Sequence, residues 1–112
     1  CDAEAACREL SEYYDIIRHE SGSGIAGTTI ELVPKGFNKA VGISAVCRLF
    51  DIPWEDTIVF GDSNNDLAMF EYAAVKVAMG NGSEKIKALA DHITQDMFNY
   101  GIRNGLEYLK LI

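Results

Sequence analysis

Apolar residues recur along the chain at spacings that change from segment to segment, and these spacings predict its helices and strands. From Ala3 to His19 they fall at helical intervals, which predicts a helix over that stretch. The SGSG sequence at residues 21–24 predicts a break. A β-branched run from Thr28 to Val33 predicts a strand, which Pro34 ends before a turn at Lys35-Gly36.

From residue 36 onward, short apolar runs alternate with amphipathic segments. The apolar runs have the length of strands buried on both faces, and the amphipathic segments have apolar positions at helical spacing. The expected helices cover residues 38–50, 66–74, 83–90 (with Ser83 as the N-cap) and 98–109, and the expected strands cover residues 57–60, 75–79 and 92–94. This alternation is typical of an α/β protein whose parallel strands are joined by right-handed crossovers.

The stretch TIVFGDSNND at residues 57–66 places two acids where a predicted strand ends. In open parallel sheets, ligands bind beyond the carboxyl ends of the strands. Gly61 and Asp62 occupy that position, and Asp66 follows in the first turn of the next expected helix. The stretch is therefore in the right place for a functional site.

Composition and charge exclude some classes of protein. With 112 residues, of which 48% are hydrophobic, the chain suits one modest soluble domain. Its net charge of −7 argues against a nucleic acid partner. There is no apolar run of about 18 residues and no signal peptide, so we expect neither a membrane span nor secretion. Cys1, Cys7 and Cys47 form no CxxC pair and fit reduced thiols in a cytoplasmic protein, with Cys47 buried in an apolar helix.

Four interpretations of GDSNND compete, and two of them meet immediate difficulties. A calcium loop of the EF-hand type needs glycine at position six and glutamate at position twelve, where Leu67 and Ala73 stand, and this excludes it. A GDS-type esterase would use Ser63 as nucleophile with a DxxH motif, but neither His19 nor His92 follows an aspartate by three residues, which disfavours that class. The third interpretation is a plain turn whose acids only cap a helix or complement its dipole.

The fourth interpretation is a magnesium site for phosphoryl transfer. Mg²⁺ prefers oxygen ligands and is commonly held by one or two carboxylates together with a substrate phosphate. Asp62 is placed to bind the cation directly, and Asp66 to act as a second ligand or to hold an ordered water. Asn65 can donate its side-chain amide to a phosphate oxygen, and the backbone N–H groups of the helix start favour an anion. The residues of this stretch leave both the magnesium site and the plain turn open.

Three stretches taken together resemble a known family. VPKGFNKA at 33–40, VFGDSNNDLAMF at 59–70 and VAMGNGSEKIKALADHIT at 77–94 are similar, in order and spacing, to the C-terminal part of the Cof-type phosphatases, subfamily IIB of the haloacid dehalogenase-like superfamily. The likeness runs from Ile30 to the end of the chain. It implies a Rossmann-like core that hydrolyses phosphate monoesters, often of sugars, with Mg²⁺, and a cap domain inserted into that core that shapes substrate choice.

The resemblance also implies roles for individual residues. Lys39 matches the lysine that neutralises charge between an attacking carboxylate and the phosphate. Asp62 matches the aspartate that binds Mg²⁺, Asp66 the second acid of the same motif, and Asn65 the asparagine that contacts the substrate phosphate. Asn81 matches part of a loop near the site, although a plain turn explains it equally well. The expected catalytic residues are thus Lys39, Asp62 and Asp66, with Lys39 and Asn65 at the phosphate and both acids at the metal.

The attacking aspartate of the family has no counterpart in this sequence. In the family it belongs to a DxDGT motif on the central strand, whereas Asp2-Ala3-Glu4 is the nearest arrangement here and follows no strand. We therefore expect residues 1–33 to be the end of a cap domain and residues 34–112 to be the C-terminal part of the core. Because the chain begins at Cys1 rather than Met, we expect a piece of a longer protein that is inactive as a phosphatase on its own.

Without that central strand, the predicted strand at residues 57–60 has an open edge. Such an edge can pair with another chain. The alternative to a phosphatase fragment is therefore a non-catalytic module that forms a homo-oligomer through this edge. For the phosphatase, the expected partner is a small phosphate ester, with no role for nucleic acid or membrane.

Overall fold

The chain forms two compact units. A computed structural model describes residues 3–20 and 28–112. The first unit is Cys1–Phe37 and the second is Asn38–Ile112. The break expected at residues 21–24 lies outside the described residues.

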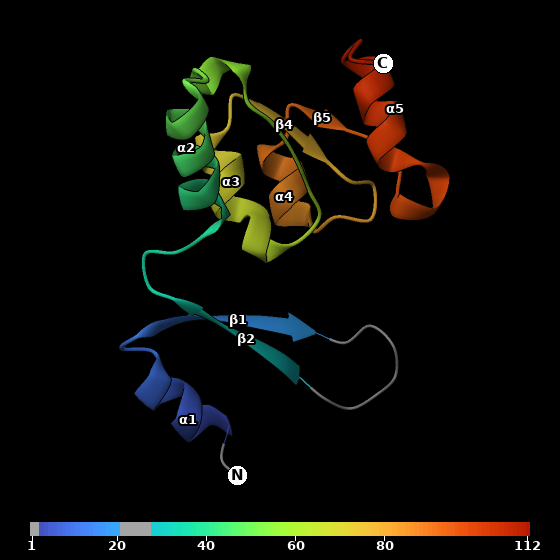
Figure 1. The fold of residues 1–112 in the computed structure, drawn as a ribbon. Helices are drawn as coiled ribbons and strands as arrows, with labels where there is room; N and C mark the ends of the chain where they lie inside the picture. Colours follow the sequence, from blue (N-terminus) through green and yellow to red (C-terminus); the bar gives the residue numbers. More distant parts are fainter. Residues whose placement is uncertain (1–2, 21–27) are drawn as a thin grey trace. The chain divides into compact units, whose positions relative to one another are not determined.

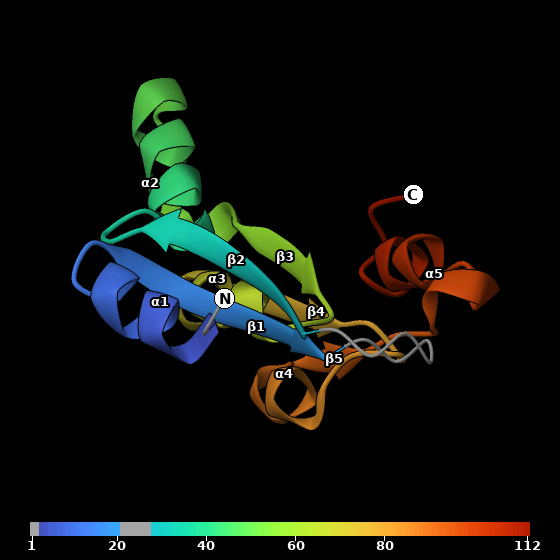
Figure 2. The same cartoon turned by 90° about the horizontal axis from the view of Figure 1, so that it is seen from below.

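The first unit consists of a helix and a β-hairpin. Helix α1 (Ala3–Leu10) is followed by β1 (Tyr14–Glu20) and β2 (Thr28–Pro34), which pair in antiparallel register along their whole lengths. Figures 1 and 2 show α1 beside this hairpin. Arg18 of β1 and Glu4 of α1 form an ion pair at 3.8 Å that joins the helix to the hairpin. The strand expected from Thr28 is confirmed and extends to Pro34.

The helix expected from Ala3 to His19 is wrong in its second half. After α1 ends at Leu10, the chain turns and continues as a strand from Tyr14. Tyrosine and isoleucine favour strands when a partner is present, and β2 supplies the backbone hydrogen bonds of such a partner. The pairing with a later segment therefore decides the conformation, which the helical spacing alone could not show.

The second unit contains a parallel sheet of three short strands. Its strands are β3 (Ile58–Gly61), β4 (Val75–Ala78) and β5 (His92–Ile93), and their order in the sheet follows their order in the chain. Figure 2 shows them side by side. The expected parallel α/β fold is confirmed. Within the described residues, β3 has β4 as its single neighbour, so its other edge is open as expected.

Helices connect and follow these strands, and the one predicted N-cap, Ser83, is confirmed. The helices are α2 (Lys39–Phe50), α3 (Leu67–Tyr72), α4 (Glu84–Leu89) and α5 (Gly101–Tyr108), with 3-10 turns η1 (Trp54–Asp56), η2 (Asn64–Asp66) and η3 (Met97–Asn99). Asn38 caps α2 by accepting from the Val41 N–H at 3.1 Å, and Ser83 caps α4 as predicted. The last helix begins later than expected, because Tyr100 adopts a left-handed conformation with φ +56° between η3 and α5.

Helices cover both faces of the sheet. On one face, Phe70 of α3 and Ile86 of α4 are almost completely buried against Val59 of β3 and its neighbours. On the other face lies α5, which Figure 1 shows across the sheet from α3 and α4. It approaches so closely that a Cβ on Gly105 would lie 2.5 Å from Phe60 Cε1. The sheet is therefore the middle layer of three.

Both cysteines within the described residues are free thiols. Cys7 and Cys47 are buried, as the apolar surroundings of Cys47 predicted. In the part of the chain that the structure describes, no helix is long and apolar enough to cross a membrane.

Thr57 fixes the entry into β3. Its buried hydroxyl donates to the Trp54 carbonyl and accepts from the Ala74 N–H at 3.0 Å. We expect Thr57→Val to lower the free energy of unfolding by about 1–2 kcal/mol, because that N–H loses its acceptor in a buried place. Urea unfolding measures the loss. Thr57→Ser keeps the hydroxyl and should lose less, and equal losses in the two variants would contradict this role.

Candidate functional site

After the carboxyl end of β3 the chain forms a loop whose backbone donates hydrogen bonds to one carboxylate, that of Asp66. Asp62 is exposed, whereas Asp66 is 3% exposed. Asp66 Oδ2 accepts from the backbone N–H groups of Asp62, at 2.9 Å, and Ser63, at 3.2 Å. Ser63 and Asp66 together form a capping box at the start of η2. The loop therefore holds the Asp62 side chain at the edge of the sheet where ligands bind in this fold class.

Lys39, the first residue of α2, brings a positive charge to this loop. Its Nζ donates to Asp66 Oδ1 and forms an ion pair with it. The Lys39 side chain is 51% exposed, while that of Asp66 is 4% exposed. Lys39 therefore lies beside Asp66, as expected, and about half of its side chain is exposed. The catalytic roles of these residues remain predictions.

The pKa of Asp66 lies below its ordinary value. Burial alone would raise it, because a buried charge loses its water. The hydrogen bond from Lys39, the two backbone N–H groups and the lysine charge stabilise the carboxylate and outweigh burial. Asp66 is therefore charged at neutral pH.

This lowered pKa makes stability depend on pH with a definite sign. The folded pKa of Asp66 lies below the unfolded value of about 3.9, so its contribution is complete above that value and is lost as the pH falls through the folded pKa. We expect Asp66→Asn to lower the free energy of unfolding by about 1–2 kcal/mol at pH 7, allowing for the partial exposure of Lys39. The difference between wild type and variant should shrink below about pH 4. Urea unfolding at a series of pH values tests this, and a pH-independent difference would contradict it.

Asn65 has its side-chain oxygen engaged within the loop. Ser63 Oγ donates to Asn65 Oδ1, which turns the donor end of the amide away from Ser63. Its neighbour Asn64 contacts the start of α4, since Ser83 Oγ lies 3.5 Å from Asn64 Oδ1. The proposed phosphate contact of Asn65 is compatible with this orientation and stays a prediction.

Asn81, whose role the sequence left undecided, contacts Asp62: its Nδ2 lies 3.4 Å from Asp62 Oδ2. It lies in the turn after β4, between two glycines that permit close approach. A Cβ on Gly80 would lie 2.8 Å from the Asp96 nitrogen, and a Cβ on Gly82 would lie 2.8 Å from the Met79 oxygen and 3.3 Å from Asp62 Cα. The turn is thus held between the Asp62 loop and the segment after β5. The Gly-Asn-Gly pattern was the sequence signal for such a close approach.

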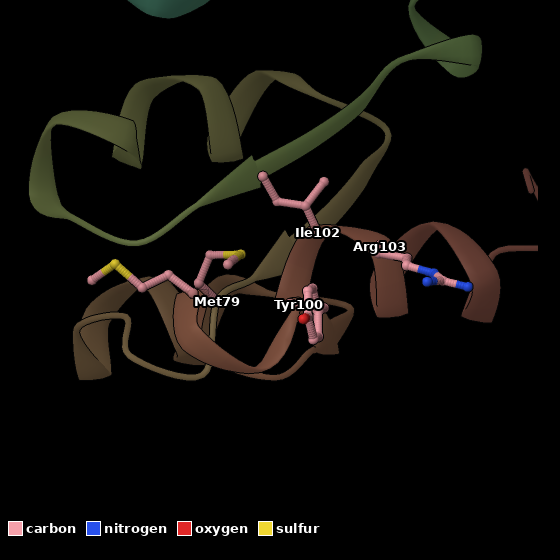
Figure 3. A pocket seen from close by; sticks show the side chains of 6 residues that line it. Met79, Tyr100, Ile102 and Arg103 are labelled. Carbon is pink, nitrogen blue, oxygen red and sulfur yellow. The ribbon is translucent and has the colours of Figure 1, made fainter.

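A small apolar hollow is lined in part by Met79, which precedes this turn. It has a volume of about 250 Å³, and Figure 3 shows it with Met79 from the end of β4 and Tyr100, Ile102 and Arg103 from the start of α5. Met97 also lines it, and the Met97 N–H donates to Asn81 Oδ1 at 3.1 Å. Met97, in the wall of the hollow, is therefore hydrogen-bonded to Asn81, which lies beside Asp62.

The donor atoms at the loop fit a partly hydrated divalent cation. Asp62 presents an exposed carboxylate, and no described residue donates a hydrogen bond to its Oδ1. Both oxygens of Asp66 already accept hydrogen bonds. Within residues 3–20 and 28–112 there is no group of three or more His, Cys, Asp or Glu residues that could hold a metal. This set suits Mg²⁺, which keeps several waters and takes few protein carboxylates.

Comparison with known protein sequences points to one family. The family described as haloacid dehalogenase-like hydrolase matches residues 2–106. The 5-amino-6-(5-phospho-D-ribitylamino)uracil phosphatase YitU of Bacillus subtilis (strain 168) is 41% identical over 83 residues, which are 73% of this chain and 31% of the relative. The chain therefore spans under a third of the length of that relative.

Solved structures show the same fold. The subclass IIB sugar phosphatase BT4131 of the haloacid dehalogenase (HAD) superfamily superposes with a TM-score of 0.79 at 32% identity, covering 97% of this chain and 40% of that one. A haloacid dehalogenase-like hydrolase from Bacteroides thetaiotaomicron gives 0.78 at 32% identity, covering 95% and 38%. Sequence family and fold agree: the chain belongs to the haloacid dehalogenase-like hydrolases, and the Cof-type resemblance seen in its sequence is confirmed.

Proposed function

We propose that the chain is the C-terminal part of a Mg²⁺-dependent phosphatase that hydrolyses small phosphate monoesters, with sugar phosphates as the substrate class. The observation that carries this lies at the carboxyl end of β3, where Asp66 accepts hydrogen bonds from both the Lys39 ammonium and the Asp62 backbone N–H. On this proposal residues 1–33 are the end of a cap domain and residues 34–112 belong to the core. A cytoplasmic location fits the free thiols of Cys7 and Cys47.

Each residue has a distinct task in this proposal. Asp62 would hold Mg²⁺ through its exposed carboxylate. Asp66 would fix the position of the loop and of the Lys39 ammonium, and it would also reach the cation as a second acid. Lys39 would balance the negative charge of the phosphate with its half-exposed ammonium. Asn65 would donate its amide to a phosphate oxygen. When bound, Mg²⁺ supplies positive charge that polarises the phosphoryl group.

The nucleophile would come from outside these residues. The sequence contains no pair of aspartates two positions apart, and covalent catalysis through an aspartyl-phosphate requires an attacking carboxylate. We therefore expect the isolated chain to leave p-nitrophenyl phosphate intact in the presence of Mg²⁺. Robust turnover by the isolated chain, abolished by Asp62→Ala, would overturn the assignment of the nucleophile.

The protein that carries this chain together with the rest of the core provides the positive test. We expect it to hydrolyse p-nitrophenyl phosphate and sugar phosphates, and to lose turnover when EDTA removes the cation. Restoration by added Mg²⁺ would support the proposal. Full activity in EDTA would show that the divalent cation plays no part.

The open edge of β3 favours one alternative, a non-catalytic module that dimerises through it. Sedimentation of the isolated chain separates the two. A symmetric dimer would support edge pairing, whereas a stable monomer would count against it.

A further inference from the structure

The backbone of Asp62 is fixed on two sides, but its side chain depends on one neighbour. The Asp62 N–H donates to Asp66 Oδ2 at 2.9 Å, and the Asp62 carbonyl accepts from the Ser83 N–H at 2.8 Å. Within the described residues, the side chain that donates to the Asp62 carboxylate is that of Asn81, whose Nδ2 lies 3.4 Å from Asp62 Oδ2. The direction of this carboxylate is therefore set from the turn after β4.

The amide of Asn81 has a defined orientation. The backbone N–H of Met97 can only donate, and it lies 3.1 Å from Asn81 Oδ1. The oxygen of the amide must therefore face Met97, which leaves the nitrogen, with its two hydrogens, facing Asp62. A reversed amide would place two donors together at Met97 and two acceptors together at Asp62.

The backbone around Asn81 also limits how far the amide can move. Gly80 and Gly82 let the turn approach the segment after β5 on one side and the Asp62 loop on the other. The Gly82 N–H donates to the Met79 carbonyl at 2.8 Å, and the Gly80 N–H donates to the Gln95 carbonyl at 3.1 Å. Asn81 thus lies between two glycines whose backbone N–H groups are hydrogen-bonded, and this limits how far its amide can move.

We propose that Asn81 is a positioning residue for the cation site: it holds Asp62 Oδ2 through its amide nitrogen and leaves Asp62 Oδ1 to bind the divalent cation. This rests on the function proposed above. Hydrogen bonds from neighbours orient metal-ligating carboxylates, and losing such a partner commonly weakens metal binding about 10- to 100-fold. Because the contact is long and exposed, the lower end of that range is expected.

The test measures cation affinity, without turnover, in the protein that carries this chain together with the rest of the core, because the proposed site is completed there. Mg²⁺ is titrated into ¹⁵N-labelled protein, and the Ser63 and Met97 backbone amides and the Asn81 side-chain amide report binding. Asp62→Asn should abolish the saturable response. Asn81→Ala should raise the dissociation constant for Mg²⁺ about 10-fold, with the melting temperature of the metal-free protein close to that of the wild type.

The matched control is Asn104→Ala. Asn104 Nδ2 donates to the Asn99 carbonyl at 2.9 Å, so this variant loosens the turn beside Met97 without removing a donor to Asp62. Its Mg²⁺ affinity should equal that of the wild type. Equal weakening in both asparagine variants would mean that turn disorder is the cause, and would overturn the positioning role.

Two further outcomes separate this inference from the proposed function. If Asp62→Asn abolishes binding while Asn81→Ala stays within twofold of the wild type, the positioning role is wrong and the cation site stands. If Asp62→Asn leaves the response unchanged, or the wild type shows none, the cation site itself is wrong and the role of Asn81 falls with it.

Discussion

In the complete enzyme proposed here, Asp62→Asn and Lys39→Ala should each lower turnover of phosphate monoesters by about 100- to 1,000-fold. The first removes a charge that would hold Mg²⁺, and the second removes a positive charge placed beside the phosphate. Removing one group that stabilises charge in the transition state commonly lowers kcat by a factor of about this size. Initial rates on p-nitrophenyl phosphate at saturating Mg²⁺ measure the loss, which should appear mainly in kcat.

Two surface variants serve as controls for this result. Arg48→Ala and Asp56→Asn remove charges of the same signs from exposed positions away from the loop, in the last turn of α2 and in η1. Both should keep rates near those of the wild type. Unchanged rates in both Lys39→Ala and Asp62→Asn would remove these residues from the site.

Gly101→Ala should destabilise the second unit by about 3 kcal/mol or more. A Cβ at this position would lie 2.1 Å from the Gln95 carbonyl oxygen and 2.9 Å from that of Asp96, and backbone atoms cannot move aside as a flexible side chain can. The Gly101 carbonyl also accepts a buried hydrogen bond from Thr94 Oγ1 at 2.7 Å, which a shifted backbone would lose. Urea or thermal unfolding measures the change.

The control is Gly42→Ala in α2. A Cβ there would meet nothing within 4 Å, and alanine favours a helix interior over glycine by about 0.5–1 kcal/mol. This variant should therefore be slightly more stable than the wild type. If Gly101→Ala and Gly42→Ala had the same effect, the close approach of Gly101 to Gln95 would not be limiting.

The sequence predicted local structure where local signals decide it. Helix α2 has apolar positions at helical spacing, so its start and end were predicted to within a residue. The hairpin was predicted only in its second strand. The turn after α1 and the pairing of β1 depend on β2, and a helical interval between Tyr14 and Ile17 carries no information about that partner.

The candidate site divides in a similar way. The position of Asp62 followed from the end of an apolar strand, and Lys39 from its match to a family motif. The hydrogen bonds that Asp66 accepts from the loop backbone were not predicted, because they depend on three-dimensional geometry. Asn81 was left between two explanations for the same reason, since its contacts with Asp62 and Met97 join segments distant in the sequence.

The ion pair between Lys39 and Asp66 has a consequence for the order of folding. Its partners are 27 positions apart in the chain, so this contact closes a long loop and requires α2 to lie against α3. The hydrogen bonds from the Asp62 and Ser63 backbone to Asp66 join residues only four and three positions apart and can form earlier. Refolding followed by the Lys39 side chain should therefore lag behind the appearance of helical signal, and the charge pair would be completed late on the path to the native state.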